Sequence, residues 1–149
     1  MLFNIIFGYI LAWIFLLLIY KKDKRIVFFI TPFASVVAYT VNAFGLHLNL
    51  WGLTPIEYGH FSALPFDLGY FAFSGVFLVF LTKRLSANPY MIVLVTSIII
   101  TLMEYTALLL GKVVYYNNWN IFGTFISYLV SHTIVYWYYL WTRRYFEFK

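Results

Sequence analysis

The chain has 149 residues, of which 64% are apolar and only 10% are charged. Soluble domains carry about 25% charged residues, so this composition excludes a water-soluble fold and favours a membrane-embedded one. The net charge of +5 does not predict a nucleic-acid partner, because the basic residues form short clusters beside apolar runs. The absence of cysteine excludes disulfides and thiolate metal sites.

Five apolar runs, each near the roughly 20 residues needed to cross a bilayer, predict an all-α integral membrane bundle. They cover approximately residues 3–20, 26–44, 67–82, 90–111 and 120–142. We therefore predict that residues 1–149 form a single bundle of five transmembrane helices. The first run lacks the basic start and the cleavage site of a signal peptide and is interpreted as a retained helix. The third run is short, so its helix either begins earlier, near Pro65, or crosses a thinner bilayer.

The basic residues predict the orientation of the bundle, because cytoplasmic loops are enriched in Lys and Arg. With five spans, nine of the ten fall on one side and only Lys112 falls on the other. The nine are Lys21, Lys22, Lys24, Arg25, Lys83, Arg84, Arg143, Arg144 and Lys149. This pattern predicts an N-terminus outside and a C-terminus in the cytoplasm, in a bacterial plasma membrane.

Aromatic residues at both predicted boundaries agree with this topology, since Trp and Tyr favour the membrane–water interface. The inner belt is predicted to contain Tyr136, Trp137, Tyr138, Tyr139 and Trp141, and the outer belt Trp51, Tyr115, Tyr116 and Trp119. Most of these residues are interpreted as belt or packing residues.

The segment 45–66 is the one long connection, and it is predicted to lie outside. Its apolar and polar residues are interleaved, so it either lies along the interface or folds back over the bundle. Glu57 and His60 have a spacing that some metal sites use, and His47 and Asp67 are the other weak metal-ligand candidates. Two ligands make a weak signal, and we predict no metal and no cofactor.

Buried ionisable residues predict where a functional site lies, because a charge at the centre of a membrane helix costs about 2.5–3.5 kcal/mol. Glu104 shares a helical face with Ser97 and Thr101. Comparable stripes on the other helices are expected to converge with it in the outer half of the membrane. These polar residues, here called the outer-half polar cluster, are Tyr39, Thr40, Asn42, Asp67, Tyr70, Ser74, Ser97, Thr101, Glu104, Thr124, Ser127, Ser131 and His132.

These residues also have purely structural explanations that require no ligand. Ser, Thr and Tyr in membrane helices often only bond a neighbour, worth around 0.6 kcal/mol on average. Asp67 follows Pro65 and suits the first turn of a helix, where the helix dipole favours a carboxylate. His132 is predicted to be a partner of Glu104, a proton relay or a satisfied core histidine. The residues predicted to bind a ligand are Glu104, Asp67, His132, Asn42, Tyr70, Ser127 and Ser131.

Three short motifs resemble a known family. They are LPFDLGYF at 64–71, MEYTALLLG at 103–111 and YYNNWN at 115–120. Together they are similar to a family of small, uncharacterised multi-pass membrane proteins of spore-forming Firmicutes. The resemblance implies a small polytopic architecture and singles out Asp67, Glu104 and Trp119, but it implies no activity.

Three functions are compatible with the sequence. We favour a non-enzymatic bundle that binds a small ligand, ion or lipid headgroup in an outer-half cavity, as a transporter component or partner subunit. The second is an intramembrane enzyme acting on a lipid or isoprenoid, with Glu104 and His132 as acid–base pair and Asp67 as a metal ligand. The third is an assembly protein that docks a partner through segment 45–66. We expect the protein to lie in the lipid bilayer and either to form a homo-oligomer or to bind a membrane-protein partner.

Overall fold

The computed structural model describes residues 1–145, so Lys149 of the predicted basic set lies outside the described residues. Four helical stretches there are long and apolar enough to cross a membrane, which indicates a membrane protein. They are η1–α1 (Asn4–Ile10 and Leu11–Lys22), α2 (Lys24–His47), α3–η3–α4 (His60–Pro65, Phe66–Tyr70 and Phe71–Arg84) and α5 (Pro89–Leu109). The last helix, α6 (Ile121–Tyr145), is as long, but its many Ser, Thr and Tyr residues leave it below the same apolar limit.

The predicted helices match these boundaries except at the third span. The prediction began it at residue 67, whereas the helix begins at His60 and includes Pro65. The whole stretch has 25 residues, long enough to cross an ordinary bilayer without local thinning. Residues 60–66, which the prediction assigned to the outer segment, therefore belong to the third span.

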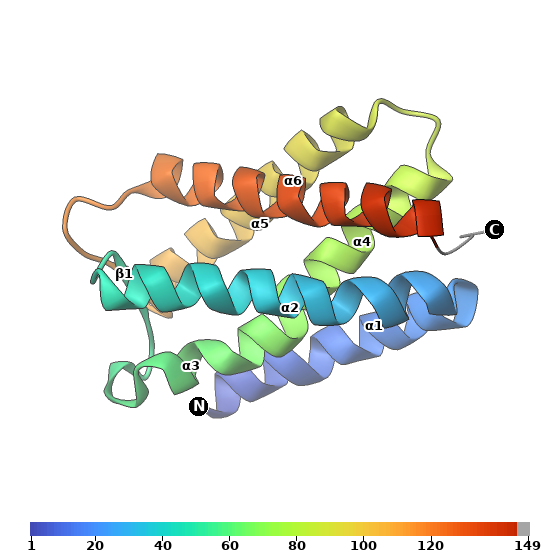
Figure 1. Ribbon diagram of the computed structural model, residues 1–149. Helices are drawn as coiled ribbons and strands as arrows, with labels where there is room; N and C mark the ends of the chain where they lie inside the picture. Colours follow the sequence, from blue (N-terminus) through green and yellow to red (C-terminus); the bar gives the residue numbers. More distant parts are fainter. Residues whose placement is uncertain (146–149) are drawn as a thin grey trace.

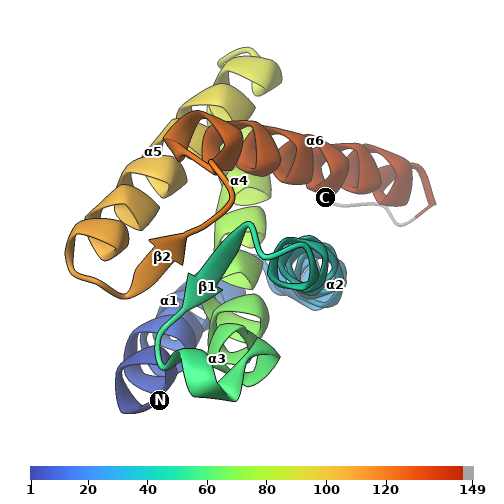
Figure 2. The same cartoon turned by 90° about the vertical axis from the view of Figure 1, so that its left-hand side faces the viewer.

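The helix α4 lies at the centre of the bundle. It contacts α1, α2, α5 and α6, while α5 packs mainly on α6 and η1 packs on η3. Figure 2, viewed along the bundle, shows α1 and α5 on different sides of α4, with the β-strands crossing in front of it. Gly69 permits the close approach of η3 to η1, because an added Cβ would lie 2.1 Å from the Gly8 carbonyl oxygen.

The two ends of the bundle differ in chemistry. The α1–α2 turn, the α4–α5 connection and the end of α6 lie together at one end (Figure 1), here called the basic end. Eight of the described basic residues lie in or next to these segments: Lys21, Lys22, Lys24, Arg25, Lys83, Arg84, Arg143 and Arg144. An ion pair of 2.6 Å between Lys83 Nζ and Asp23 Oδ2 joins α4 to the α1–α2 turn.

A two-stranded antiparallel sheet covers the other end, where the N-terminus also lies (Figure 1). Its strands are far apart in the sequence, with α3, α4 and α5 between them. For brevity the sheet is called the hairpin, and this end of the bundle the hairpin end. The strands β1 (Trp51–Leu53) and β2 (Val113–Tyr115) pair antiparallel, with Trp51 opposite Tyr115. The 3₁₀ turn η2 (Ile56–Tyr58) follows β1. The residues between α2 and α3 thus fold back over the bundle. The prediction of an all-helical fold is confirmed, and these two three-residue strands are a small addition to it.

Candidate functional site

Glu104, near the end of α5, is held by three hydroxyl groups. The Tyr115 hydroxyl donates to Glu104 Oε1 at 2.7 Å, and the Tyr128 hydroxyl of α6 donates to Oε2. Thr124 Oγ1 lies 3.3 Å from Oε1. This carboxyl group therefore joins α5, α6 and the hairpin, and charge-assisted bonds of this kind are stronger than neutral ones.

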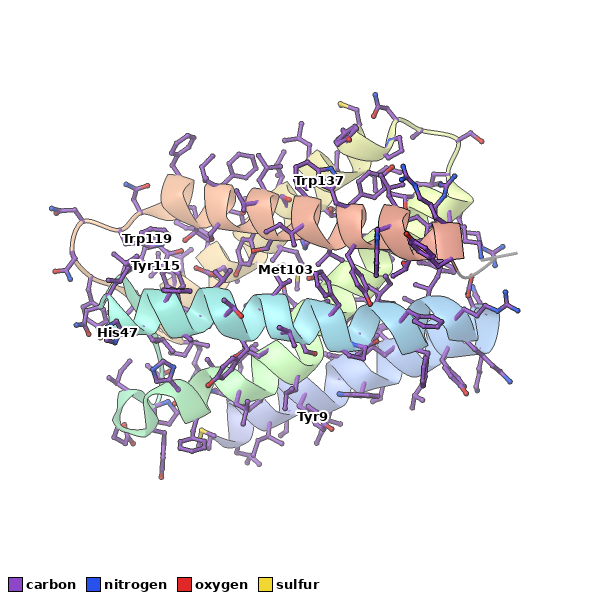
Figure 3. All side chains as sticks on the ribbon, viewed as in Figure 1. Tyr9, His47, Met103, Tyr115, Trp119 and Trp137 are labelled. Carbon is purple, nitrogen blue, oxygen red and sulfur yellow. The ribbon has the colours of Figure 1, made fainter. Side chains whose placement is uncertain are left out.

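A chain of donors extends this network toward the surface. The indole of Trp119 donates to Thr124 Oγ1 at 2.9 Å, and Thr124 donates to the Tyr115 oxygen at 2.8 Å. Burial raises the pKa of the Tyr115 phenol, and the neighbouring Glu104 carboxylate raises that pKa further. Tyr115 consequently keeps its proton and serves as a donor. Figure 3 shows Tyr115 and Trp119 together at the hairpin end.

Asp67 is the second acidic residue of the predicted site. It is linked through Asn42 to β1, the other strand of the hairpin. Its side chain is buried in η3, and its Oδ1 accepts a bond of 2.6 Å from Asn42 Nδ2 of α2. Asn42 Oδ1 accepts in turn from the Trp51 indole at 3.0 Å. Gly45 makes room for that indole, because a Cβ there would lie 2.0 Å from the Trp51 ring. Glu104 therefore anchors β2 directly through Tyr115, whereas Asp67 is connected to β1 only through Asn42.

His132 is buried deeper in the bundle and links three helices. Ser97 Oγ of α5 lies 2.9 Å from its Nδ1, and Ser74 Oγ of α4 lies 3.2 Å from its Nε2. Both hydroxyls also lie 2.8 Å from a carbonyl of their own helix, those of Val93 and Phe71. A neutral imidazole has one donor and one acceptor nitrogen, which fits one serine donating to the ring and the other accepting from it.

A cavity of about 50 Å³ lies between these networks. It has room for water but not for a larger molecule. Among its lining residues are predicted site residues from four helices, namely Asn42, Ser74, Glu104, Thr124, Ser127, Ser131 and His132. Ser127 and Ser131 bond carbonyl groups of their own helix. The structure thus gathers most of the outer-half polar cluster around one space.

Six of the thirteen predicted members do not line this cavity. Asp67 and Ser97 bond cavity residues from behind, Tyr70 lines an adjoining groove, and Thr101 bonds the Ser97 carbonyl. The other two lie farther away. Tyr39 and Thr40 are exposed on α2, and Thr40 bonds the Val36 carbonyl of its own helix. Only Asn42 represents α2 at the site, because its side chain is buried against Asp67 while Tyr39 and Thr40 are exposed. The prediction that Tyr39 and Thr40 line the cavity is wrong.

A larger groove of about 430 Å³ adjoins the cavity at the hairpin end. One wall comes from η1 and α1, the other from α5, and the hairpin closes it at the end of the bundle. The groove is lined mainly by apolar residues, including Phe3, Phe7, Leu11, Phe66, Met103, Ala107 and Leu110. Its polar lining comprises Asn42, Tyr70, Glu104, Thr106, Lys112 and Tyr128, and the Tyr70 hydroxyl lies 3.2 Å from the Met103 sulfur.

The acid–base pair considered from the sequence is not bonded together. Glu104 and His132 line the same cavity, but each bonds different partners, and Tyr128 lies beside both. The metal-ligand candidates are also dispersed: His47, Glu57 and His60 are exposed, whereas Asp67 is buried. Within residues 1–145, no three His, Asp or Glu side chains form a group that would hold a metal ion.

Of the aromatic members of the site, Tyr70 was predicted and the family resemblance singled out Trp119, but no hydrogen-bonding role was predicted for the others. Trp51, Tyr115 and Trp119 were interpreted as belt residues, yet their polar atoms bond the buried cluster. Tyr128 was not singled out. Its spacing of four residues from both Thr124 and His132 on α6 was the available signal, since such residues share a helical face.

Comparison with protein-family models, with curated proteins and with solved structures finds no match.

Proposed function

We propose that the protein binds a lipid-like molecule, with an apolar chain in the 430 Å³ groove and a polar head at Glu104. The observation that carries this proposal is a largely apolar groove that ends on a hydrogen-bonded carboxyl group. Its volume falls within the 300–1,000 Å³ typical of small-molecule sites. This proposal refines the first of the three functions considered from the sequence, which is the binding of a small ligand or lipid headgroup.

The walls of the groove support access from the bilayer. Phe7 and Leu11 on one side and Met103 and Leu110 on the other line the groove and are exposed. They lie on helical stretches that are apolar enough to cross a membrane. An apolar chain can therefore enter between η1–α1 and α5 without passing through water.

The polar end of the groove favours a head that donates hydrogen bonds. The hydroxyl groups of Tyr115 and Tyr128 donate to Glu104, and Thr124, whose proton goes to Tyr115, lies 3.3 Å from Oε1. A carboxylate has about four lone-pair positions, so acceptor capacity remains. A hydroxyl or amine head would use the remaining capacity. A head group without a hydrogen-bond donor would leave the remaining acceptor positions of Glu104 unused. The preferred ligand class is therefore a long-chain alcohol, amine or monoacylglycerol.

The test compares two probes of the same chain length on the full chain in detergent. Monooleoylglycerol carries hydroxyl donors, and methyl oleate carries none. Monooleoylglycerol is expected to raise the Tm in a saturable way, because a ligand that binds only the folded state stabilises it by mass action. Glu104→Gln should weaken this binding roughly fivefold, since bonds to a charged acceptor exceed neutral ones by about 1 kcal/mol.

Two matched variants on α5 provide the control. Thr106→Phe fills the groove and should abolish the shift in Tm, whereas Leu109→Phe lies outside the groove and should preserve it. Equal shifts for both probes, or for both variants, would contradict a specific site and indicate general solvation by lipid.

We also propose that α6 is a fifth span and that the basic end is cytoplasmic, as predicted from the sequence. The support is the gathering of eight basic residues at one end (Figure 1) and the packing of α6 along α5, α2 and α4. A bacterial plasma membrane remains the predicted location.

The cysteine-free sequence makes this topology directly testable. Single substitutions Glu57→Cys, Ser86→Cys and Tyr145→Cys are exposed to a membrane-impermeant maleimide in intact cells. Only Glu57→Cys should react before the cells are permeabilised. Labelling of Tyr145→Cys in intact cells would show that α6 does not cross the membrane.

A further inference from the structure

A second hollow lies at the basic end, far from the groove and unrelated to it. Its volume is about 550 Å³, and it is formed by the α1–α2 turn and the end of α4. Every lining residue is charged: Lys22, Asp23, Lys24, Arg25, Lys83 and Arg84. Five cations and one carboxylate give this concave surface a net charge of +4.

The single carboxylate is already engaged. Asp23 Oδ2 bonds Lys83 Nζ at 2.6 Å, and Asp23 Oδ1 accepts from the Ile26 backbone N–H at 3.2 Å. Asp23 thereby fixes the end of α4 against the start of α2 and shapes the hollow. Of the other cations, Lys22, Lys24 and Arg84 are exposed on the surface of the hollow.

The general preference of Lys and Arg for the cytoplasmic side does not by itself require such a hollow. Lys21, Arg143 and Arg144 lie at the same end and are exposed outside it. The convergence of the other five on one concave surface comes from the packing of three segments. Because α2 also begins here, the partial positive charge of its N-terminus adds to the same field.

We propose that this hollow binds the phosphate group of an anionic phospholipid. A phosphate has the charge and the acceptor oxygens that clustered Lys and Arg recognise. A lipid is the favoured source, because the hollow lies where three stretches apolar enough to span a membrane end, at the level of lipid headgroups. This site is independent of the ligand proposed for Glu104.

The test titrates the detergent-solubilised full chain with dioleoylphosphatidylglycerol, with dioleoylphosphatidylcholine as the neutral reference. Each basic residue near an anionic headgroup contributes roughly fivefold in affinity. K24Q/R84Q should therefore weaken phosphatidylglycerol binding about 25-fold. The control K21Q/R144Q removes one Lys and one Arg at the same end, outside the hollow, and should change binding less than about threefold.

Equal losses for the two double variants would overturn the site, because they would show diffuse attraction to the whole basic end. Retained binding by the charge-preserving variant K24R/R84K would support it. If K24Q/R84Q does not fold, K22Q should still bind about fivefold more weakly than K21Q, and equality of these two would overturn the proposal. Displacement of phosphatidylglycerol by millimolar inorganic phosphate would assign the hollow to free phosphate and overturn the lipid source.

Discussion

The two halves of the bundle are built in different ways. At the basic end and through the middle, the core is a continuous apolar cluster; its most buried members are Leu16, Ile26, Ile30, Val76, Leu78 and Val79. At the hairpin end, hydrogen-bonded polar residues, a cavity and a groove occupy the space between the same helices. Apolar contacts between the helices stabilise the first half, whereas hydrogen-bonded polar groups and the space around them lie between the helices of the second half.

The largest effect is expected in the apolar half. Leu78→Ala should lower the free energy of unfolding by about 2–4 kcal/mol, because it leaves a cavity in a fully buried position. Unfolding in mixed detergent–SDS micelles measures this loss. Monooleoylglycerol binding should not change, and Phe28→Ala, on the lipid-facing surface, should cost little. A smaller loss for Leu78→Ala than for Phe28→Ala would reject the proposed division of the bundle.

Asn42→Leu is expected to give the next largest effect, about 1–3 kcal/mol. It removes the donor to Asp67 and the acceptor for Trp51, and leaves both polar groups without this partner. The same unfolding assay applies, with the exposed Thr40→Val as control. Replacing both partners, in N42L/D67L, should recover stability relative to N42L, because no buried carboxyl group then lacks its donor. No recovery would show that Asp67 has another stabilising contact.

Tyr115→Phe should cost about 1 kcal/mol. Glu104 loses one donor and retains Tyr128 and Thr124, so the penalty is smaller than for Asn42→Leu. The exposed Tyr116→Phe is the matched control and should be neutral in unfolding. An equal cost for both variants would place the effect in the hairpin surface and not in the bond to Glu104.

Ser131→Ala should have the smallest effect, within about 0.5 kcal/mol, because its hydroxyl bonds a carbonyl of its own helix. Ser97→Ala should cost more, since Ser97 also holds His132. The reverse order in the unfolding assay would indicate that Ser131 makes an interhelical contact.

The sequence predicted the helices well because long apolar runs and clustered basic residues are strong signals. It also placed Glu104 and His132 at one cavity, since helical spacing and depth determine which residues converge. Of the two explanations for the short third run, the earlier helix start is confirmed, but the helix begins at His60 and not near Pro65. Pro65 suggested a helix start. The helix tolerates this proline, whose missing N–H costs one bond close to the helix N-terminus.

The hairpin could not be predicted from its strands. Each strand has three residues, too few to show the alternation that identifies a β-strand. The pairing joins residues more than 50 positions apart, and local patterns carry no information on that contact. Without it, the donors Trp51 and Tyr115 could not be assigned to Asn42 and Glu104.

The anchoring of both hairpin strands would have a consequence for the rates at which the ligand proposed above exchanges. A molecule that arrives from water must wait until the Trp51 and Tyr115 bonds break together, because either bond alone still holds one strand. A molecule that arrives from the bilayer enters between η1 and α5 with the hairpin in place. Exchange with the bilayer is therefore expected to be fast, and exchange with water slow.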